Sequence, residues 1–593
     1  MENIPRYLIT TADESTWKFD RPVIFLGEWC RLYERRHVWE DMDAIVATPY
    51  GLGQFRKDVD HEVARSLEDK LFPKLCAVLN KHHDVKYSER FWKIVLGHWF
   101  RRYVDVLLNR INTLKHVLDT YIISGTTVYS DQHYMLATPD SYSAVYSFND
   151  NYWNSVLTGR ILDTMNPVSI RNNIESITGC SVPYFSFEEL RTAPTFVRSI
   201  FKWAFKTIRS ATAWFALDSD SFIINSYLPK KEEILMQLML RQIPQLWSSP
   251  VIKISEKPEP ELRKYLASRM KINSSDDLEK IISLMIFELI PVVYLEGFES
   301  VNNITCKIRW PDKPKFIFTS NNFDYDEVFK LWAAKKSEIG SKYIVGQHGN
   351  NPAIHRYIIN TVDQATSDKY ITWGWRDGRL NYVPGFIFKT IKMNSKYYNS
   401  QSGLLLIELN LNHRITTWDS YAEFVDYFEE QQRFVAGLSI LPRKELTIRL
   451  HSGCKYQEWS EEKRWEMFDP LLKLDGGSGD IQDALLKNKL VVHSYDSTGM
   501  LETLSRNIPT LAFWQNGLDH LRDSAKPYYQ LLIDAGIVHL TPESIADKVN
   551  TVWDDVDTWW NQYDVQNARS IFCNRYAKVS QTPIQDIVSI LKD

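Results

Sequence analysis

The chain has 593 residues, too many for one hydrophobic core, so we expect two or more domains. Its 70 basic and 74 acidic residues leave a net charge of -4, which gives no reason to expect nucleic acid as a partner. The six cysteines form no CxxC or Cys/His cluster. The sequence therefore predicts neither a zinc site nor a disulfide framework, and it fits a reducing cytoplasm.

Membrane contact is expected to be peripheral. The N-terminus lacks a basic region followed by an apolar one, which argues against a secretory signal. The longest apolar run, residues 281–295, is interrupted by Glu288 and Pro291 and is too short to span a bilayer. We therefore expect a cytoplasmic protein that reaches at most the inner face of the membrane.

The N-terminal part combines strands with a long helical region. Residues 7–10 and 22–27 are typical of strands, and the second leads into Glu28 at its carboxyl end, where ligands of open parallel sheets gather. From about 58 to 118 apolar residues recur every three or four positions, which predicts a helical insertion. His98 falls in this insertion, where a buried histidine satisfied by its neighbours is the alternative to a functional one.

A strand–helix–strand unit follows farther along the chain. Residues 315–320 and 342–345 are predicted strands, and residues 324–339 are the helix between them. The second strand ends in Gly346-Gln-His-Gly-Asn350, which brings Gln347 and His348 to the carboxyl edge. Glycines on both sides imply close approach of the backbone, so we interpret His348 as functional. The apolar residues 291–295 are also predicted to form a strand.

A polar, small-residue stretch at 394–403 is typical of a linker, so we place a domain boundary there. It separates an N-terminal α/β domain, residues 1–395, from a second one, residues 404–560. Residues 561–593 are predicted to be a C-terminal helical segment that packs back on the first domain. In the second domain His451 follows the strand at 446–450. Two α/β domains that meet at a cleft are the expected architecture.

The stretch from His493 to Trp514 is predicted to be strand, turn, helix and strand. A helix that begins with Ser497, Thr498 and Gly499 offers N–H groups and hydroxyls to an anion. Glu502 lies about one helical turn farther on, near the same face, where it can accept hydrogen bonds from a ribose. An ordinary strand-to-helix turn that binds nothing is the alternative.

Three histidines, His348, His451 and His493, each lie at or just after the end of a predicted strand. If the two domains face one another, these strand ends line the cleft. Helix N-termini and histidine or arginine donors can hold a nucleotide-activated substrate without a metal ion. We interpret no Asp-x-Asp pair of the sequence as one that holds a divalent ion for a sugar diphosphate, so we predict no metal site.

These residues carry a resemblance to known enzymes. The stretch Asp496-Ser-Thr-Gly-Met-Leu-Glu502 followed by Asn507-Ile-Pro-Thr510 resembles the donor-binding turn of GT-B glycosyltransferases and of the related UDP-GlcNAc 2-epimerases. Together with residues 25–30, 93–99 and 346–349, it resembles a family of transferases from O-antigen and surface-polysaccharide gene clusters. The resemblance covers most of the chain.

The resemblance implies a GT-B-like α/β fold, with two Rossmann-like domains facing a cleft and a helical insertion in the first. It also implies that Glu502 binds ribose, that Ser497 and Thr498 bind phosphate, and that His348 lies at the reaction centre. If the reaction inverts configuration, the general base is expected to be Glu28, then His348, then His98. The expected donor-binding set is Gln347, Gly349, His451, His493, Asp496, Ser497, Thr498, Gly499 and Glu502.

The activity implied is the transfer of a sugar from a nucleotide-activated donor to a glycan or glycolipid acceptor of the cell surface, without a further cofactor. CMP-Kdo or a related acidic sugar is one candidate donor, because no Asp-x-Asp pair is interpreted as a metal site and because the histidines suit a carboxylate. Two alternatives stay open. One is a UDP-sugar 2-epimerase-like enzyme, and the other is a non-catalytic carbohydrate-binding assembly factor.

Overall fold

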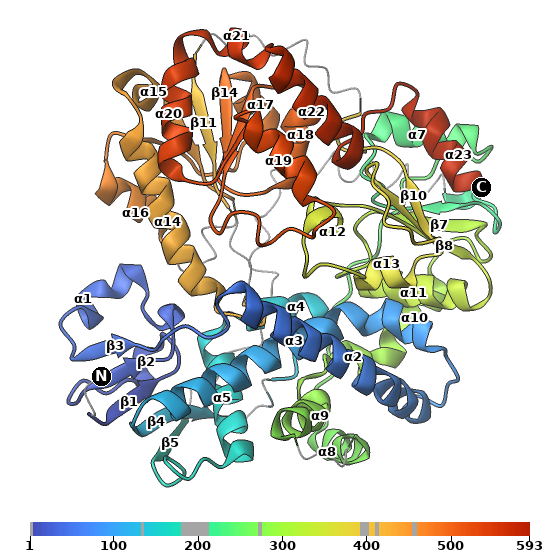
Figure 1. The fold of residues 1–593 in the computed structure, drawn as a ribbon. Helices are drawn as coiled ribbons and strands as arrows, with labels where there is room; N and C mark the ends of the chain where they lie inside the picture. The colour runs from blue at the N-terminus through green and yellow to red at the C-terminus, as the bar shows by residue number, and fades with distance from the viewer. Residues whose placement is uncertain are drawn as a thin grey trace, which may run out of the picture.

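The computed structural model describes residues 4–131, 134, 136–178, 213–270, 276–391, 402–409, 414–452 and 459–593. Most of the expected linker at 394–403 lies outside these ranges. The described chain forms three parallel β-sheets surrounded by helices (Figure 1). The α/β prediction is therefore confirmed.

The first sheet, near the N-terminus, has the strand order β3-β2-β1-β4-β5. All of its neighbouring strands run parallel. Its strands are β1 (Arg6–Ile9), β2 (Val23–Phe25), β3 (Ala44–Val46), β4 (Ile123–Ser130) and β5 (Ile174–Thr178). The predicted strands at 7–10 and 22–27 are thus the central strand, β1, and its inner neighbour, β2.

The second sheet has the order β10-β9-β8-β7-β6, so its strands are arranged in sequence order. They are β6 (Phe222–Ile223), β7 (Phe316–Thr319), β8 (Lys342–Gly346), β9 (Lys369–Thr372) and β10 (Tyr382–Pro384). Residues 1–395, expected to form one α/β domain, therefore contain two separate sheets. A series of parallel strands can end one sheet and begin another without a change of local pattern, because sheet membership depends on long-range pairing.

The third sheet has the order β13-β12-β11-β14-β15-β16. Its strands are β11 (Leu404–Ile407), β12 (Leu446–Arg449), β13 (Lys473–Asp475), β14 (Leu490–His493), β15 (Thr510–Phe513) and β16 (Val538–His539). In chain order this is the arrangement 3-2-1-4-5-6 of a Rossmann sheet, with its switch point between β11 and β14. Ligands of such sheets bind outside the carboxyl ends of the strands at that point.

Two long helices, α2 (Gln54–His82) and α3 (Glu89–Thr120), form the predicted helical insertion. Ser88 caps α3 by accepting a hydrogen bond from the Phe91 N–H. Buried residues cover several faces of α3, because α3 packs against α2 and also against α4, α9, α11 and α13. Helix α3 therefore links helices of the first sheet region to helices of the second.

The remaining helices surround the sheets or connect them. In the first and second sheet regions they are α1 (Arg36–Trp39), α4 (Ser141–Ser147), α5 (Asn151–Met165), α7 (Lys230–Met239), α8 (Pro260–Arg269), α9 (Asp277–Leu289), α10 (Phe298–Lys307), α11 (Glu327–Glu338), α12 (Asn351–Ile354) and α13 (Val362–Thr366). Around the third sheet they are α14 (Ser420–Gly437), α15 (Ile440–Lys444), α16 (Glu461–Phe468), α17 (Ile481–Leu486), α18 (Thr498–Ser505), α19 (Lys526–Asp534), α20 (Pro542–Val552), α21 (Val556–Trp560) and α22 (Tyr563–Tyr576), and the last helix is α23 (Pro583–Lys592).

The strand expected at 291–295 is wrong. Residues Val292–Tyr294 form a 3-10 helix, and the N–H groups of Val292 and Val293 donate to the carbonyls of Thr138 and Pro139 instead of to a neighbouring strand. A short buried apolar run does not distinguish a strand from a helical turn, because both bury the same side chains.

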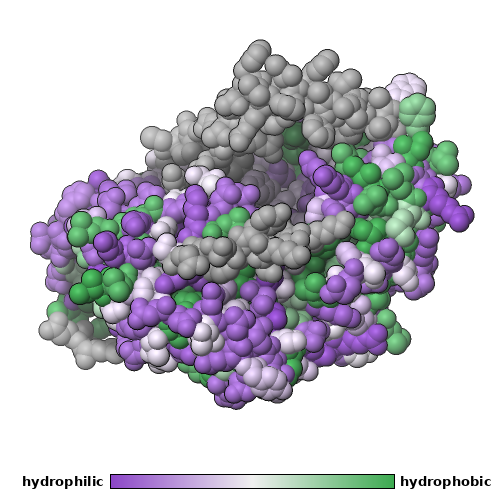
Figure 2. All heavy atoms as spheres, turned by 90° about the horizontal axis from the view of Figure 1, so that it is seen from above, coloured by the Kyte–Doolittle hydropathy of each residue, from purple (hydrophilic) through white to green (hydrophobic). Residues whose placement is uncertain are grey.

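The C-terminal helices return to the second sheet. Helix α22 packs on α18 and α19, while α23 lies beside α7 at the second sheet (Figure 1). Ile584, Ile587, Val588 and Leu591 of α23 share a hydrophobic core with residues of β7, β8 and β9. Seen from above, the described surface is mainly hydrophilic, with hydrophobic residues gathered on the right (Figure 2).

Candidate functional site

The turn between β14 and α18 is held by a buried histidine. Ser497 caps α18, because its hydroxyl accepts a hydrogen bond from the Met500 N–H at 3.0 Å. The ring nitrogens of His493 lie 3.2 Å from the Ser497 hydroxyl and 3.3 Å from the Thr503 hydroxyl. Burial lowers the pKa of His493 to about 3, so the ring is neutral at physiological pH.

His493 therefore supports the turn through contacts within the protein, and its expected contact with the donor stays a prediction. The ring is fully buried, and both nitrogens have protein partners. Gly499 is explained by the same packing. A Cβ atom on Gly499 would lie 3.0 Å from the His493 ring, so the close approach that the glycine permits is to this histidine.

Asp496 connects four parts of the structure. Its carboxylate accepts hydrogen bonds from Asn350 at 2.7 Å, from the Tyr529 hydroxyl at 2.9 Å and from His520 at 3.0 Å. The Asp496 side chain is only 6% exposed. A buried carboxylate with three donors is fixed in place, so Asp496 sets the position of the groups around it.

The Gln347–Asn350 turn after β8 meets the α18 turn directly. The Asn350 N–H donates to the Thr498 hydroxyl at 3.1 Å. A Cβ atom on Gly349 would lie 3.2 Å from the same oxygen, which explains why this residue is small. The structure thus brings together two stretches that the sequence separates by about 150 residues, one at the edge of the second sheet and one at the edge of the third.

The Gln347 side chain is bonded within the protein, and its expected role in donor binding stays a prediction. It is fully buried, and its amide oxygen accepts from the Trp373 N–H at 2.9 Å and from the Trp375 indole at 2.7 Å. Its amide nitrogen donates to the Gly349 carbonyl at 2.7 Å. All of these bonds shape the turn that carries His348.

His348 and His98 both contact the ring of Phe323. The His348 ring meets the Phe323 ring edge-on, with 5.9 Å between centroids, and the His98 ring stacks on Phe323 at 5.3 Å. His348 is exposed, while His98 is partly buried. Loss of bulk water lowers the pKa of both histidines, that of His98 to about 4.

Glu502 faces the second sheet from α18. Its carboxylate lies 3.6 Å from the Lys389 ammonium, and the Lys389 ammonium also lies 4.9 Å from the centre of the Tyr227 ring. The charge of Lys389 contributes to lowering the pKa of His348. His348, Lys389 and Glu502 therefore belong to one group of polar side chains at the junction of the second and third sheets.

Two further candidates lie elsewhere. Glu28 begins a 3-10 helix (Glu28–Cys30) after β2 and is held by Arg31, with its oxygens 2.7 and 2.6 Å from one guanidinium nitrogen. This region faces the third sheet, because the Arg414 guanidinium stacks on Trp29 at 3.7 Å. His451 is exposed after β12 and does not line the cavity described next.

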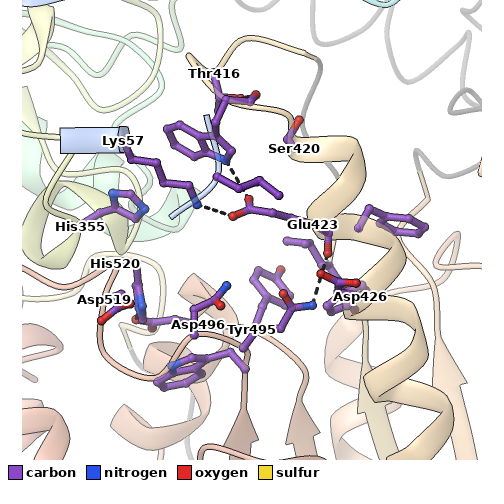
Figure 3. Close-up of a pocket in the computed structure, with 18 of the residues that line it drawn as sticks. Lys57, His355, Thr416, Ser420, Glu423, Asp426, Tyr495, Asp496, Asp519 and His520 are labelled. Atoms are coloured by element: carbon purple, nitrogen blue, oxygen red, sulfur yellow. Dashed lines mark hydrogen bonds and ion pairs between the residues drawn. The ribbon is translucent and has the colours of Figure 1, made fainter. Parts of the chain in front are cut away.

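A cavity of about 420 Å³ opens at the carboxyl edge of the third sheet, where β11, β14 and β15 end (Figure 3). Residues 52–57 of the α2 region and residues 351–357 after β8 close its other sides. Asp496 belongs to both this cavity and the junction. The sequence analysis missed its other main polar and aromatic residues, which are Lys57, His355, Tyr357, Thr416, Trp418, Ser420, Glu423, Asp426, Trp514, Asp519 and His520.

One sequence signal could have identified part of these cavity residues, namely a position directly after a predicted strand. Trp514 directly follows β15, so the strand-end rule that selected His348 also selects Trp514. Lys57 carries no such signal, since it lies within α2 and reaches the cavity only through packing. In the part of the chain that the structure describes, no three His, Cys, Asp or Glu side chains gather closely enough to hold a metal ion.

Comparison with known protein families identifies the family to which this sequence belongs. The LIC12162 family of transferases matches residues 6–591, which is nearly the whole chain. The chain belongs to this family. As a LIC12162 family member it is a transferase. None of the described helices is both long and apolar enough to cross a bilayer. No curated protein matches the sequence significantly.

Solved structures show only distant likeness to this LIC12162 family transferase. Anabaena Alr3699/HepE, in complex with UDP and glucose, is 12% identical with a TM-score of 0.32, over 63% of this chain and 100% of HepE. WaaG, a glycosyltransferase involved in lipopolysaccharide biosynthesis, is 11% identical with a TM-score of 0.27, over 63% of this chain and 97% of WaaG. TarM is 12% identical with a TM-score of 0.29, over 47% of this chain, which spans 54% of TarM.

Proposed function

We propose that the protein is a metal-independent glycosyltransferase that moves a sugar from a nucleotide-activated donor to a glycan or glycolipid acceptor of the cell surface. The family match supplies the transferase class. The observation that carries the proposal is the direct contact between Asn350 and the turn that starts α18. It joins the carboxyl edges of two parallel sheets, where nucleotide ligands of such sheets bind.

The donor phosphate is assigned to the first turn of α18. This helix has eight residues, and the N–H groups at its start lack partners within the helix. Lys389 and His348 lie at the same junction and offer further donors to a phosphate or to the carboxylate of an acidic sugar such as Kdo. Glu502 is assigned to the ribose hydroxyls, a role that requires it to leave Lys389 when the donor binds.

The general base remains to be assigned among three residues. His348 is the candidate nearest the donor turn, and His98 shares its Phe323 neighbour. Glu28 lies between the first and third sheets, so it suits an acceptor that enters from that side. If Glu28 is the base, the Glu28→Gln variant loses turnover about 100-fold or more while it still binds the nucleotide. Full turnover by this variant excludes the role.

A thermal-shift screen of the full chain tests the proposal. The panel contains CMP, CDP, UDP, GDP and ADP, and also TDP because the rhamnosyltransferase SpnG was solved with thymidine diphosphate. Near saturation one nucleotide is expected to raise the melting temperature by about 2–4 °C, because it binds only the folded state. The responding nucleotide names the donor class, and a response to CMP supports a CMP-activated acidic sugar.

Matched variants locate the binding. Glu502→Gln is expected to lose most of the shift, because a ribose would lose its charged acceptor. Glu543→Gln is the control, since Glu543 is an exposed residue of α20. No shift with any nucleotide, or an equal shift in Glu502→Gln and the wild type, contradicts the proposed donor site.

A further inference from the structure

The cavity at the third sheet is a compartment separate from the proposed donor site. Thr498, Glu502, His348 and Lys389 do not line it. The Asn350 contacts to Asp496 and Thr498 lie between the two regions. A ligand in the cavity therefore reaches Asp496 without contacting Glu502, and the two sites share only the turn between β14 and α18.

Aromatic rings form one continuous wall of this cavity. The Trp418 ring lies 5.7 Å from Tyr357, and Tyr357 lies 5.6 Å from His355. His355 lies 5.9 Å from His520, and His520 lies 5.7 Å from Trp514. All five residues line the cavity. A row of flat rings suits the C–H face of a sugar ring, which packs on aromatic faces without needing a charge.

Four carboxylates are among the polar groups that line the cavity. Glu423 and Asp426 project from α14 on the side opposite His355 and His520, while Asp519 lies next to His520 (Figure 3). Asp496 is the fourth carboxylate that lines it. Carboxylates accept hydrogen bonds from sugar hydroxyls and repel anions, so this set favours an uncharged or amino sugar over an acidic one.

Little positive charge offsets these acids. Lys57, the lysine among the described lining residues, forms an ion pair with Glu423 and lies 4.6 Å from the centre of the Trp418 ring. Burial lowers the pKa of His355 to about 3, so this ring is neutral at physiological pH. A phosphate or an acidic sugar would find no free cation among them, which separates this compartment from a nucleotide site.

The wall at residues 351–357 is fixed against the third sheet. The Arg356 N–H donates to the His520 carbonyl at 2.9 Å, and the Arg522 N–H donates to the Ile354 carbonyl at 2.9 Å. His520 is held in turn by Asp496, whose carboxylate lies 3.0 Å from the ring nitrogen Nε2. The aromatic wall is therefore preorganised, which reduces the entropy that a bound ligand has to lose.

We propose that this cavity is the acceptor subsite and that it binds one uncharged or amino sugar unit between the aromatic wall and the carboxylates of α14. The assignment of this sugar as the acceptor rests on the proposed function. Sugar binding itself does not depend on it. The ring stacks on Trp418 and Tyr357, and the hydroxyls donate to Glu423, Asp426 and Asp519.

Saturation-transfer NMR on the full chain tests this proposal. The probes are the methyl glycosides of glucose, galactose, N-acetylglucosamine and glucosamine, with methyl glucuronoside as the acidic comparison, each at about 10 mM to detect millimolar affinity. At least one neutral or amino glycoside is expected to receive saturation, and the glucuronoside is not. No transfer to any neutral or amino glycoside, or stronger transfer to the glucuronoside, overturns the proposal.

Variants assign the signal to the cavity. Trp418→Ala is expected to abolish it, Trp418→Phe to retain part of it, and Asp426→Asn to weaken binding about tenfold through the loss of one charged acceptor. Asp426 is exposed, so its replacement is compatible with folding. Trp214→Ala is the control, because Trp214 is an exposed tryptophan outside the cavity. An unchanged signal in Trp418→Ala overturns the proposal.

A competition experiment separates this proposal from the proposed function. If the cavity is the acceptor subsite, a nucleotide that raises the melting temperature leaves the glycoside signal in place, because the two ligands bind together. Displacement of the glycoside by the nucleotide overturns the acceptor assignment. If no nucleotide binds while the glycoside does, the donor site of the proposed function fails and the sugar-binding cavity stands.

Discussion

At the scale of single residues, two buried glutamates at the third sheet titrate unusually. Glu408 follows β11 and Glu461 begins α16, and both are nearly inaccessible to solvent. Burial raises the pKa of each, that of Glu461 to about 7, and their mutual repulsion raises the pKa of Glu408 further. Glu408 accepts a hydrogen bond from the Trp465 indole at 3.0 Å, and its other oxygen has no partner within the described part of the chain.

These carboxyl groups contribute stability that is lost as pH rises from mild acid to neutrality. A carboxyl whose pKa is raised in the folded state binds more protons there than in the unfolded chain, so its contribution to stability falls as pH rises from about 4.5 through 7. We expect the Glu461→Gln variant to lose this contribution, so that its melting temperature falls less, or rises more, than that of the wild type between about pH 5 and pH 8, since a neutral amide does not titrate.

Scanning fluorimetry across this pH range measures the effect. Glu466→Gln is the matched control, because Glu466 is an exposed residue of α16. Equal slopes for Glu461→Gln and the wild type would show that Glu461 does not titrate in this window.

Burial also explains which site residues the sequence could not assign. His493 and Gln347 occur at strand ends with the same local pattern as His348, yet only His348 is exposed. The difference arises from partners far along the chain, since Gln347 is enclosed by Trp373 and Trp375. A strand-end rule finds the edge of a sheet and does not show which side chain turns inward.

At the scale of elements, the junction between the Gln347–Asn350 turn and α18 depends on one side chain. Asn350→Ala removes the donor to Asp496 and keeps the backbone bond to Thr498. We expect a loss of about 1–3 kcal/mol in stability, because Asp496 stays buried with two donors instead of three. Hydrogen exchange at residues 494–500 is expected to become faster.

Exchange mass spectrometry checks this expectation, with Asn351→Ala as the control because Asn351 is exposed next to Asn350. If protection at 494–500 is the same in Asn350→Ala as in the wild type, the side chain does not stabilise the junction.

Most elements could be predicted from local pattern. The helical insertion, the strands β7, β8, β11, β14 and β15, and the start of α18 follow from apolar periodicity and capping residues, which are local properties. The residues 292–294 could not be assigned in the same way, because their hydrogen bonds go to Thr138 and Pro139, more than 150 positions away.

At the scale of the whole molecule, α23 completes the core of the second sheet. Ile587 is fully buried in the cluster that includes Phe318 and Ile344. Ile587→Ala is expected to destabilise the protein by about 2–4 kcal/mol, because it leaves a cavity in a packed core. Gln585→Ala, at an exposed position of the same helix, is expected to change stability by less than about 0.5 kcal/mol.

Urea unfolding followed by tryptophan fluorescence distinguishes the two variants. Equal midpoints for Ile587→Ala and Gln585→Ala would mean that α23 adds nothing to the stability of the second sheet.

The division into three sheets and the cavity could not be predicted, for a common reason. The cavity is lined by residues within 52–57, 351–357, 416–427, 494–496 and 514–520, which come together only when all three sheet regions are assembled. Local pattern identifies a strand or a helix, but it does not report which distant segments share a wall.

The position of α23 has a consequence for how the chain folds during synthesis. Phe316, Phe318, Ile344 and Ile371 of the second sheet are translated before the whole third sheet, and the helix that covers them is translated after it. This apolar face therefore stays open on the ribosome while the third sheet forms. The interval is a period of exposure to aggregation and a stage at which a chaperone that binds apolar strands would act.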